Sequence, residues 1–443
     1  MEVHITSKQM VKPSSSNLHL LEPFQLSLLD QLASRYYSCS VLFYAEPRAD
    51  TSRFSGRLKR SLSDALAQFY PLAGRVKNNL FISDYDEGAL FVEAEVKCRL
   101  SDFVGREQEL GALNQLLPCR PFCYVQDSNA PQLAIQVNVF DCGGIALALC
   151  GLHKLVDAAT VFAFLKSWAA FNRGSSGEIP IPSMLGASSR LLPPIESMPE
   201  NADLKSLFFG DGRRRVTRSF VFDANAIATL KMRAESKSLE HPSRVLALSA
   251  FLWKHAIRAS ISVSGTPKPA FLCQPVSIRQ RMRPQLTGYS IGNMFLPIFA
   301  KYNPAGQHID QSELCVLLRQ TAQNVPNNSQ DVLQGFKTIT EQVSQIAEMV
   351  SKGNANFYVL SSWLNTFEPN EDFGWGKPSL ISIPEVDSNI PGLINWLFLK
   401  NAGAGRHNGI EVWITLSDKE MGFLEHDPEF LAFASPTPSF GKI

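Results

Sequence analysis

Two periods of hydrophobic residues occur along the first part of the chain. In residues 54–66 an apolar side chain recurs at every fourth position, which predicts a helix that packs one face on a core. Residues 133–139 alternate between apolar and polar, which is typical of a half-buried strand, and residues 145–152 form the continuous apolar run of a fully buried one. Residues 158–171 return to a helical pattern. The first half of the chain is therefore predicted to mix helices and strands.

The same patterns return in the second half. Asp223 and Ser243 are each expected to cap a helix, because their short side chains can accept a hydrogen bond from the first helical turn. Strands are also expected over residues 271–278, 358–362 and 410–416, and helices over residues 312–323 and 331–350.

A break in composition separates these halves. Residues 173–201 are dominated by Gly, Ser and Pro and carry no apolar period. We therefore expect two mixed α/β domains, residues 1–175 and 216–443, joined by a long crossover linker over residues 176–215. A chain of 443 residues is long enough for two or more domains of ordinary size.

Composition and charge exclude several classes of protein. The 42 Lys and Arg residues nearly balance the 41 Asp and Glu residues, so the chain has no basic field with which to gather nucleic acid. No apolar run approaches the ~20 residues that span a bilayer, and residues 1–17 lack the apolar core of a secretory signal. We expect a cytoplasmic protein that binds neither membrane nor nucleic acid. Its eight cysteines show no paired spacing, which indicates reduced thiols and no metal site.

The candidate chemistry lies in the segment HKLVD, residues 153–157. The sequence contains no GxSxG, HExxH or GxxxxGK[ST] motif. His153 follows the predicted buried strand, and a histidine with a near-neutral pKa can act as a general base. Taken alone, HxxxD is equally consistent with a structural histidine at a strand end and with Asp157 capping the next helix.

A second motif, DFGWG at residues 372–376, supports the catalytic interpretation. Together with HxxxD, YPLAGR at 70–75 and weaker stretches along the chain, it makes the sequence resemble the plant BAHD acyltransferases, which use acyl-coenzyme A donors. The RQRM stretch at 279–282 and SSW at 361–363 are most similar to the group that contains vinorine synthase and salutaridinol acetyltransferase.

This resemblance implies a fold and a reaction. The fold would be α/β with mixed sheets, in two similar chloramphenicol-acetyltransferase-like domains with an active-site channel between them. The protein would be a monomer without a tightly bound cofactor or metal. It would use acyl-coenzyme A, and by resemblance to the subgroup acetyl-coenzyme A, as a co-substrate. The acceptor would be a small-molecule alcohol, a plant specialised metabolite such as an alkaloid or terpenoid.

The resemblance also implies roles for individual residues. His153 would be the general base, and Ser361 and Trp363 would contact the thioester or its oxyanion. Asp157 would point away from the pocket and pair with Arg279 or Arg281. A structural role is implied for the members of the second motif, which are Asp372, Phe373, Gly374, Trp375 and Gly376. The stretch that contains Ser243 and Arg244 would lie near the pantetheine and phosphates of coenzyme A.

Three other functions are consistent with parts of this pattern. An amine could replace the alcohol as acceptor, which would make the chain an N-acyltransferase. A non-catalytic relative with a binding or regulatory role would keep the fold, but that role places no chemical demand on His153. A peptide-synthetase condensation domain carries a related HxxxD motif, but it predicts a tethered carrier domain, and the DFGWG motif weighs against it.

Overall fold

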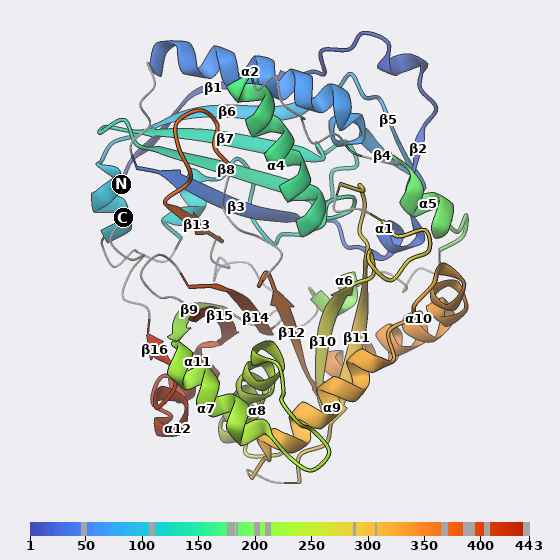
Figure 1. The fold of residues 1–443 in the computed structure, drawn as a ribbon, viewed down its shortest axis with the longest axis vertical. Helices are drawn as coiled ribbons and strands as arrows, with labels where there is room; N and C mark the ends of the chain where they lie inside the picture. Colours follow the sequence, from blue (N-terminus) through green and yellow to red (C-terminus); the bar gives the residue numbers. More distant parts are fainter. Residues whose placement is uncertain are drawn as a thin grey trace.

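The computed structural model describes residues 1–45, 51–105, 111–174, 182, 185–198, 204–208, 214–286, 289–305, 308–364, 371–383, 395–402 and 408–436. These residues form two lobes, one above the other in Figure 1, and each lobe is built on a large mixed sheet. Much of the linker expected over residues 176–215 lies outside the described residues; within it the structure has the short helices α5 (Ala187–Leu191) and α6 (Lys205–Phe208).

The first lobe contains a six-stranded sheet. In spatial order its strands are β1 (Val3–Val11), β6 (Ala89–Val96), β7 (Leu133–Phe140), β8 (Ile145–Leu152), β3 (Tyr37–Tyr44) and β13 (Leu380–Ser382). Helices α2 (Thr51–Gln68) and α4 (Ala158–Arg173) pack their apolar faces on one side of this sheet (Figure 1). All eight residues of β8 are buried, as the continuous apolar run predicts.

Smaller elements complete the first lobe. They are the sheet of β2 (Phe24–Gln25), β5 (Phe81–Ser83) and β4 (Arg75–Lys77), the helices α1 (Leu28–Leu32) and α3 (Leu100–Gly105), and the 3₁₀ turns at Leu18–Leu20, Tyr70–Ala73 and Leu113–Leu116.

The second lobe contains a seven-stranded sheet. Its order is β11 (Phe295–Tyr302), β10 (Ala270–Ser277), β12 (Asn356–Ser362), β14 (Asn395–Asn401), β15 (Ile410–Ser417), β9 (Arg215–Phe222) and β16 (Ser435–Pro436). Its helices are α7 (Ala224–Ala234), α8 (Arg244–Ser264), α9 (Gln311–Gln323), α10 (Ser329–Ser351), α11 (Asp418–Leu424) and α12 (Pro428–Leu431). Asp223 and Ser243 cap α7 and α8 as predicted, accepting the amides of Ala226 and Leu246. No helix in the described ranges is long and apolar enough to cross a membrane.

The two sheets repeat one arrangement of five strands. In the first sheet β6 and β7 are parallel, and each following pair along β7, β8, β3 and β13 is antiparallel. In the second sheet β12 and β14 are parallel, and each following pair along β14, β15, β9 and β16 is antiparallel. The structure therefore has the two similar mixed α/β domains that were expected.

One segment differs from the expected division at residue 216. Residues 371–383 belong by sequence to the second half, but β13 pairs with β3 and extends the sheet of the first lobe (Figure 1). Phe373 and Trp375 are buried in the first lobe beside Trp168 and Phe54. The segment covers an edge of the first sheet that would otherwise be unpaired. A strand of three residues has too short a pattern to show which sheet it joins.

Candidate active site

A cavity of about 640 Å³ lies between the lobes. The first lobe contributes His153 and the residues that follow it, and the second lobe contributes the ends of β10, β12 and β14. His153 lines this space together with Ser361 and Trp363, which lie more than 200 positions after it in the sequence.

The backbone of His153 is fixed on both sides where β8 ends. Its amide donates to the carbonyl of Tyr36 (2.8 Å), and its own carbonyl accepts from the Asn293 side chain (2.8 Å). The imidazole lies 4.9 Å from the ring of Tyr36 and perpendicular to that of Phe295 at 5.8 Å, measured between ring centroids. These contacts leave the ring little freedom to turn away from the cavity.

The surroundings of His153 favour the neutral imidazole. Burial lowers the pKa of His153 below its usual 6.5, because the protonated ring loses hydration. The backbone carbonyl of His153, the charge of Asp157 and the Asn293 side chain act in the opposite direction but do not cancel the effect of burial. The imidazole is therefore unprotonated at neutral pH and can accept a proton.

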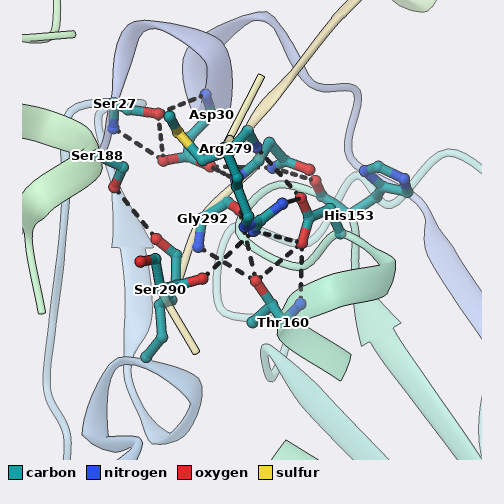
Figure 2. A network of polar contacts seen from close by, with 12 residues as sticks. Ser27, Asp30, His153, Thr160, Ser188, Arg279, Ser290 and Gly292 are labelled. Atoms are coloured by element: carbon teal, nitrogen blue, oxygen red, sulfur yellow. Dashed lines mark hydrogen bonds and ion pairs between the residues drawn. The ribbon is translucent and has the colours of Figure 1, made fainter. Parts of the chain in front are cut away.

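Asp157 holds the loop behind the imidazole. Its carboxylate caps α4 by accepting the amide of Thr160 (2.9 Å), and it accepts two hydrogen bonds from Arg279, at 2.5 and 2.9 Å. The amide of Met294 donates to it as well (3.2 Å). Figure 2 shows this network with the imidazole of His153 pointing away from it. Burial alone would raise the pKa of Asp157, but Arg279 and the amides hold that pKa below its usual value.

The structure distinguishes the two arginine candidates. Arg279 is buried, and besides Asp157 it donates to the carbonyl of Gly292 (2.8 Å). Arg281 instead donates to the carbonyl of Val325 (3.3 Å) at the loop before α10. The ion pair with Asp157 is therefore made by Arg279, and it joins the two halves of the chain.

A second buried carboxylate supports the same loop and was missed by sequence analysis. Asp30 accepts the backbone amide of Asn293 (2.6 Å) and its side-chain amide (3.0 Å), and Asn293 in turn reaches His153. Burial raises the pKa of Asp30 to about 6. Ser27, three residues before Asp30, forms a capping box with it, and that local pattern could have been noticed in the sequence.

Ser361 and Trp363 lie at the end of β12 and line the cavity with His153. The backbone amide of Trp363 donates to the carbonyl of Leu399 (2.8 Å), and its indole packs perpendicular to Phe162 and Phe398. Hydroxyl and indole groups can both donate a hydrogen bond to a developing oxyanion. The site thus combines a neutral base with two potential donors.

The second motif forms a tight turn outside the cavity. One carboxylate oxygen of Asp372 accepts the amides of Gly374, Trp375 and Gly376, at 2.7, 3.0 and 2.9 Å. Gly374 and Gly376 have φ angles of +95° and +99°, which favour glycine. None of residues 372–376 lines the cavity. In the structure this motif holds residues 371–383 on the first lobe.

Of the two residues expected near coenzyme A, one lines the cavity. Ser243 lines the cavity as well as capping α8, whereas Arg244 does not line it. Arg319 of α9 does line it and was not singled out by sequence analysis, because no local motif marks it. Within the described ranges, no three His, Cys, Asp or Glu side chains are grouped so as to hold a metal ion.

The chain is similar to known proteins over nearly its whole length. The model of the family described as the Transferase family matches residues 1–431. Limonoid 7-O-acetyltransferase from Citrus sinensis is 32% identical, over 99% of this chain and 99% of that protein.

Solved structures show the same architecture. The crystal structure of vinorine synthase superposes with a TM-score of 0.80 at 28% identity, covering 99% of this chain and 100% of that one. The structure of F. graminearum TRI101 complexed with ethyl coenzyme A has a TM-score of 0.67 at 18% identity, covering 94% and 99%. At that identity the second likeness concerns the fold alone.

Proposed function

This chain belongs to the Transferase family of BAHD acyltransferases, and on that premise we propose that it transfers an acetyl group from acetyl-coenzyme A to a hydroxyl of a plant specialised metabolite, such as an alkaloid or terpenoid. One observation carries the proposal: the neutral imidazole of His153 is fixed in a cavity to which both lobes contribute. The relatives support the acyl group and the acceptor, since they include O-acetyltransferases acting on limonoids.

His153 would act as the general base. It would take the proton of the acceptor hydroxyl while that oxygen forms a bond to the thioester carbon. When the tetrahedral intermediate collapses, the carbon–sulfur bond breaks, and the imidazolium returns its proton to the departing thiolate. Such a base contributes about 10²–10⁴-fold to the rate, and no acyl-enzyme is needed.

The oxyanion of that intermediate needs a hydrogen-bond donor to stabilise its charge. Ser361 and Trp363 line the cavity with His153, and we assign them this role. A fixed donor at such a position is worth about 10²–10³-fold in kcat. Neither group has to carry charge, so the rate should depend on pH through the imidazole alone.

The part of the cavity beside His153 suits an apolar acceptor with rings. Tyr36 and Phe122 of the first lobe cluster with Phe398 and Trp413 of the second, and all four line the cavity. Aromatic faces of this kind offer a large apolar contact area and favour stacked or edge-on rings. A bulky alcohol with a fused ring system fits this wall better than a highly charged acceptor.

The test is acetyl transfer by the purified full-length chain. Radiolabelled acetyl-coenzyme A is incubated with a panel of alkaloid and terpenoid alcohols, and both the acetyl ester and the released thiol are measured. We expect ester formation, and His153→Ala should lower kcat by about 10²–10⁴-fold without changing the far-UV spectrum. His4→Ala, an exposed histidine on β1, is the matched control and should keep full activity. Undiminished turnover in His153→Ala would contradict the assigned base.

A further inference from the structure

The short helix α1 is held against the loop of His153 by a buried lysine. Lys154 directly follows the base, and its Nζ donates to the carbonyls of Gln31 (2.7 Å) and Ala33 (2.8 Å) at the end of α1. The last carbonyls of a helix have no amide partner within that helix, so a lysine can satisfy them. This contact fixes α1 relative to His153.

Asp30, on the same helix, contacts the loop of the second lobe that reaches His153. Its carboxylate is completely buried, and each oxygen serves one residue. One oxygen accepts the backbone amide (2.8 Å) and the hydroxyl (2.7 Å) of Ser27, and the other accepts the backbone amide (2.6 Å) and the side-chain amide (3.0 Å) of Asn293. The side-chain amide of Asn293 also donates to the carbonyl of His153 (2.8 Å). Asp30 and His153 thus belong to one polar network (Figure 2).

The two hydrogen bonds of the Asn293 side chain determine which of its ends faces the base. Both partners, a carboxylate and a carbonyl, are acceptors, so they bind the NH₂ end, and the carbonyl end points away from them. That Oδ1 is buried and has no hydrogen-bond partner among the described residues. Burial lowers the pKa of His153, but the backbone carbonyl of His153 and the Asn293 side chain oppose that effect, as oxygens close to a ring N–H do. Nδ1 is the ring nitrogen nearest to the backbone, so these oxygens favour a proton on Nδ1.

Neither Asp30 nor Asn293 lines the cavity, so an effect of either on the reaction must act through His153. We propose that Asp30 is a positioning residue: it prevents the Asn293 side chain from turning over, and thereby keeps the imidazole proton on Nδ1 and the lone pair of Nε2 available in the cavity. The hydrogen bond that one ring nitrogen makes sets the protonation of the other. A reversed amide would present its NH₂ group to Nδ1 and favour the proton on Nε2, which could then take no proton from the acceptor. The inference rests on the proposed function, because it concerns the base of that reaction.

The test is the protonation of each ring nitrogen of His153, measured by NMR on the full-length chain labelled with ¹⁵N-histidine. The His153 signals are identified by their loss in His153→Ala. At neutral pH the wild type should show a protonated Nδ1 and an unprotonated Nε2. Asp30→Ala should shift both signals toward the opposite form and lower kcat about 10–100-fold, the value of one charge-assisted hydrogen bond, with little change in KM.

Two further variants separate this role from a loss of stability. Asn293→Ala removes the group through which Asp30 acts, so it should lower kcat by a similar factor, and the double variant should lose no more than Asp30→Ala alone. Asp427→Ala is the matched control, because it removes another buried carboxylate, which contacts the ring of His255 (2.8 Å) in the second lobe. It should melt earlier but keep its kcat per folded molecule and the His153 signals.

Three outcomes would overturn the inference. They are unchanged His153 signals in folded Asp30→Ala, a normal kcat in that variant, and losses that add up in the double variant. If Asp30→Ala does not fold, unchanged signals or a normal kcat in Asn293→Ala overturn it instead. The NMR measurement needs no substrate, so a wild type and variants with the expected signals but without any acetyl transfer would contradict the proposed function alone.

Discussion

At the scale of single residues, the environment of one imidazole determines the pH range of activity. Burial lowers the pKa of His153 below 6.5, so the folded enzyme keeps the neutral base to lower pH than free histidine would. We expect kcat/KM to be constant at neutral pH and to fall only below pH 6.5, as the imidazole becomes protonated. A pH profile of kcat/KM, measured at acceptor concentrations well below KM, tests this, and an acid limb centred above pH 7 would contradict it.

The Asp157–Arg279 pair should matter for stability as much as for rate. Asp157→Asn leaves Arg279 buried without its counter-ion, and breaking such a pair costs about 3–5 kcal/mol of unfolding free energy. Because the pKa of Asp157 is lowered in the folded state, the wild-type advantage should be complete at neutral pH and should be lost as the pH falls below 3.8. Urea unfolding of both proteins at several pH values tests this. Normal melting and normal turnover of Asp157→Asn would refute it.

Residue identities were predicted better than residue contacts. The two motifs located His153, Asp157 and residues 372–376, because each motif is continuous in sequence. The hydrogen bonds from Asn293 to Asp30 and His153 span 263 and 140 positions, and no periodic or local pattern can indicate contacts of that range. Because such long-range contacts leave no pattern in the sequence, Arg279 and Arg281 both remained candidates for the partner of Asp157.

At the scale of elements, the turn at residues 372–376 holds β13 against the first lobe. Gly374→Ala would put a side chain at φ +95°, a region that residues other than glycine rarely adopt, and should cost about 1–3 kcal/mol of stability. The matched control is Gly422→Ala in α11, where an added Cβ meets nothing within 4 Å and alanine is the better helix former. We expect Gly374→Ala to melt earlier and Gly422→Ala to melt at the same temperature or later.

The same pair of variants separates stability from catalysis. Since the turn does not line the cavity, Gly374→Ala should keep its kcat per folded molecule at temperatures below melting. A fall of kcat in fully folded Gly374→Ala would show that the turn reaches the reacting groups.

Elements with long periodic patterns, such as α2 and β7, were predicted from sequence, whereas β13 is too short to be assigned to a sheet.

At the scale of the whole molecule, the two lobes are not independent. A segment of the second half completes the first sheet, and the Asp157–Arg279 pair and the cluster of Tyr36, Phe122, Phe398 and Trp413 join the lobes further. We expect both lobes to unfold in one transition, because the unfolding of either lobe breaks these contacts with the other. Far-UV circular dichroism and tryptophan fluorescence should report the same urea midpoint. Two separate midpoints would show that the lobes unfold one after the other.

The place of β13 in the first sheet also affects how the chain folds during synthesis. Strand β3 ends at residue 44, whereas its partner β13 begins at residue 380. A ribosome therefore releases most of the chain before the edge of β3 can be covered, so the nascent first lobe carries an unpaired strand edge through most of translation.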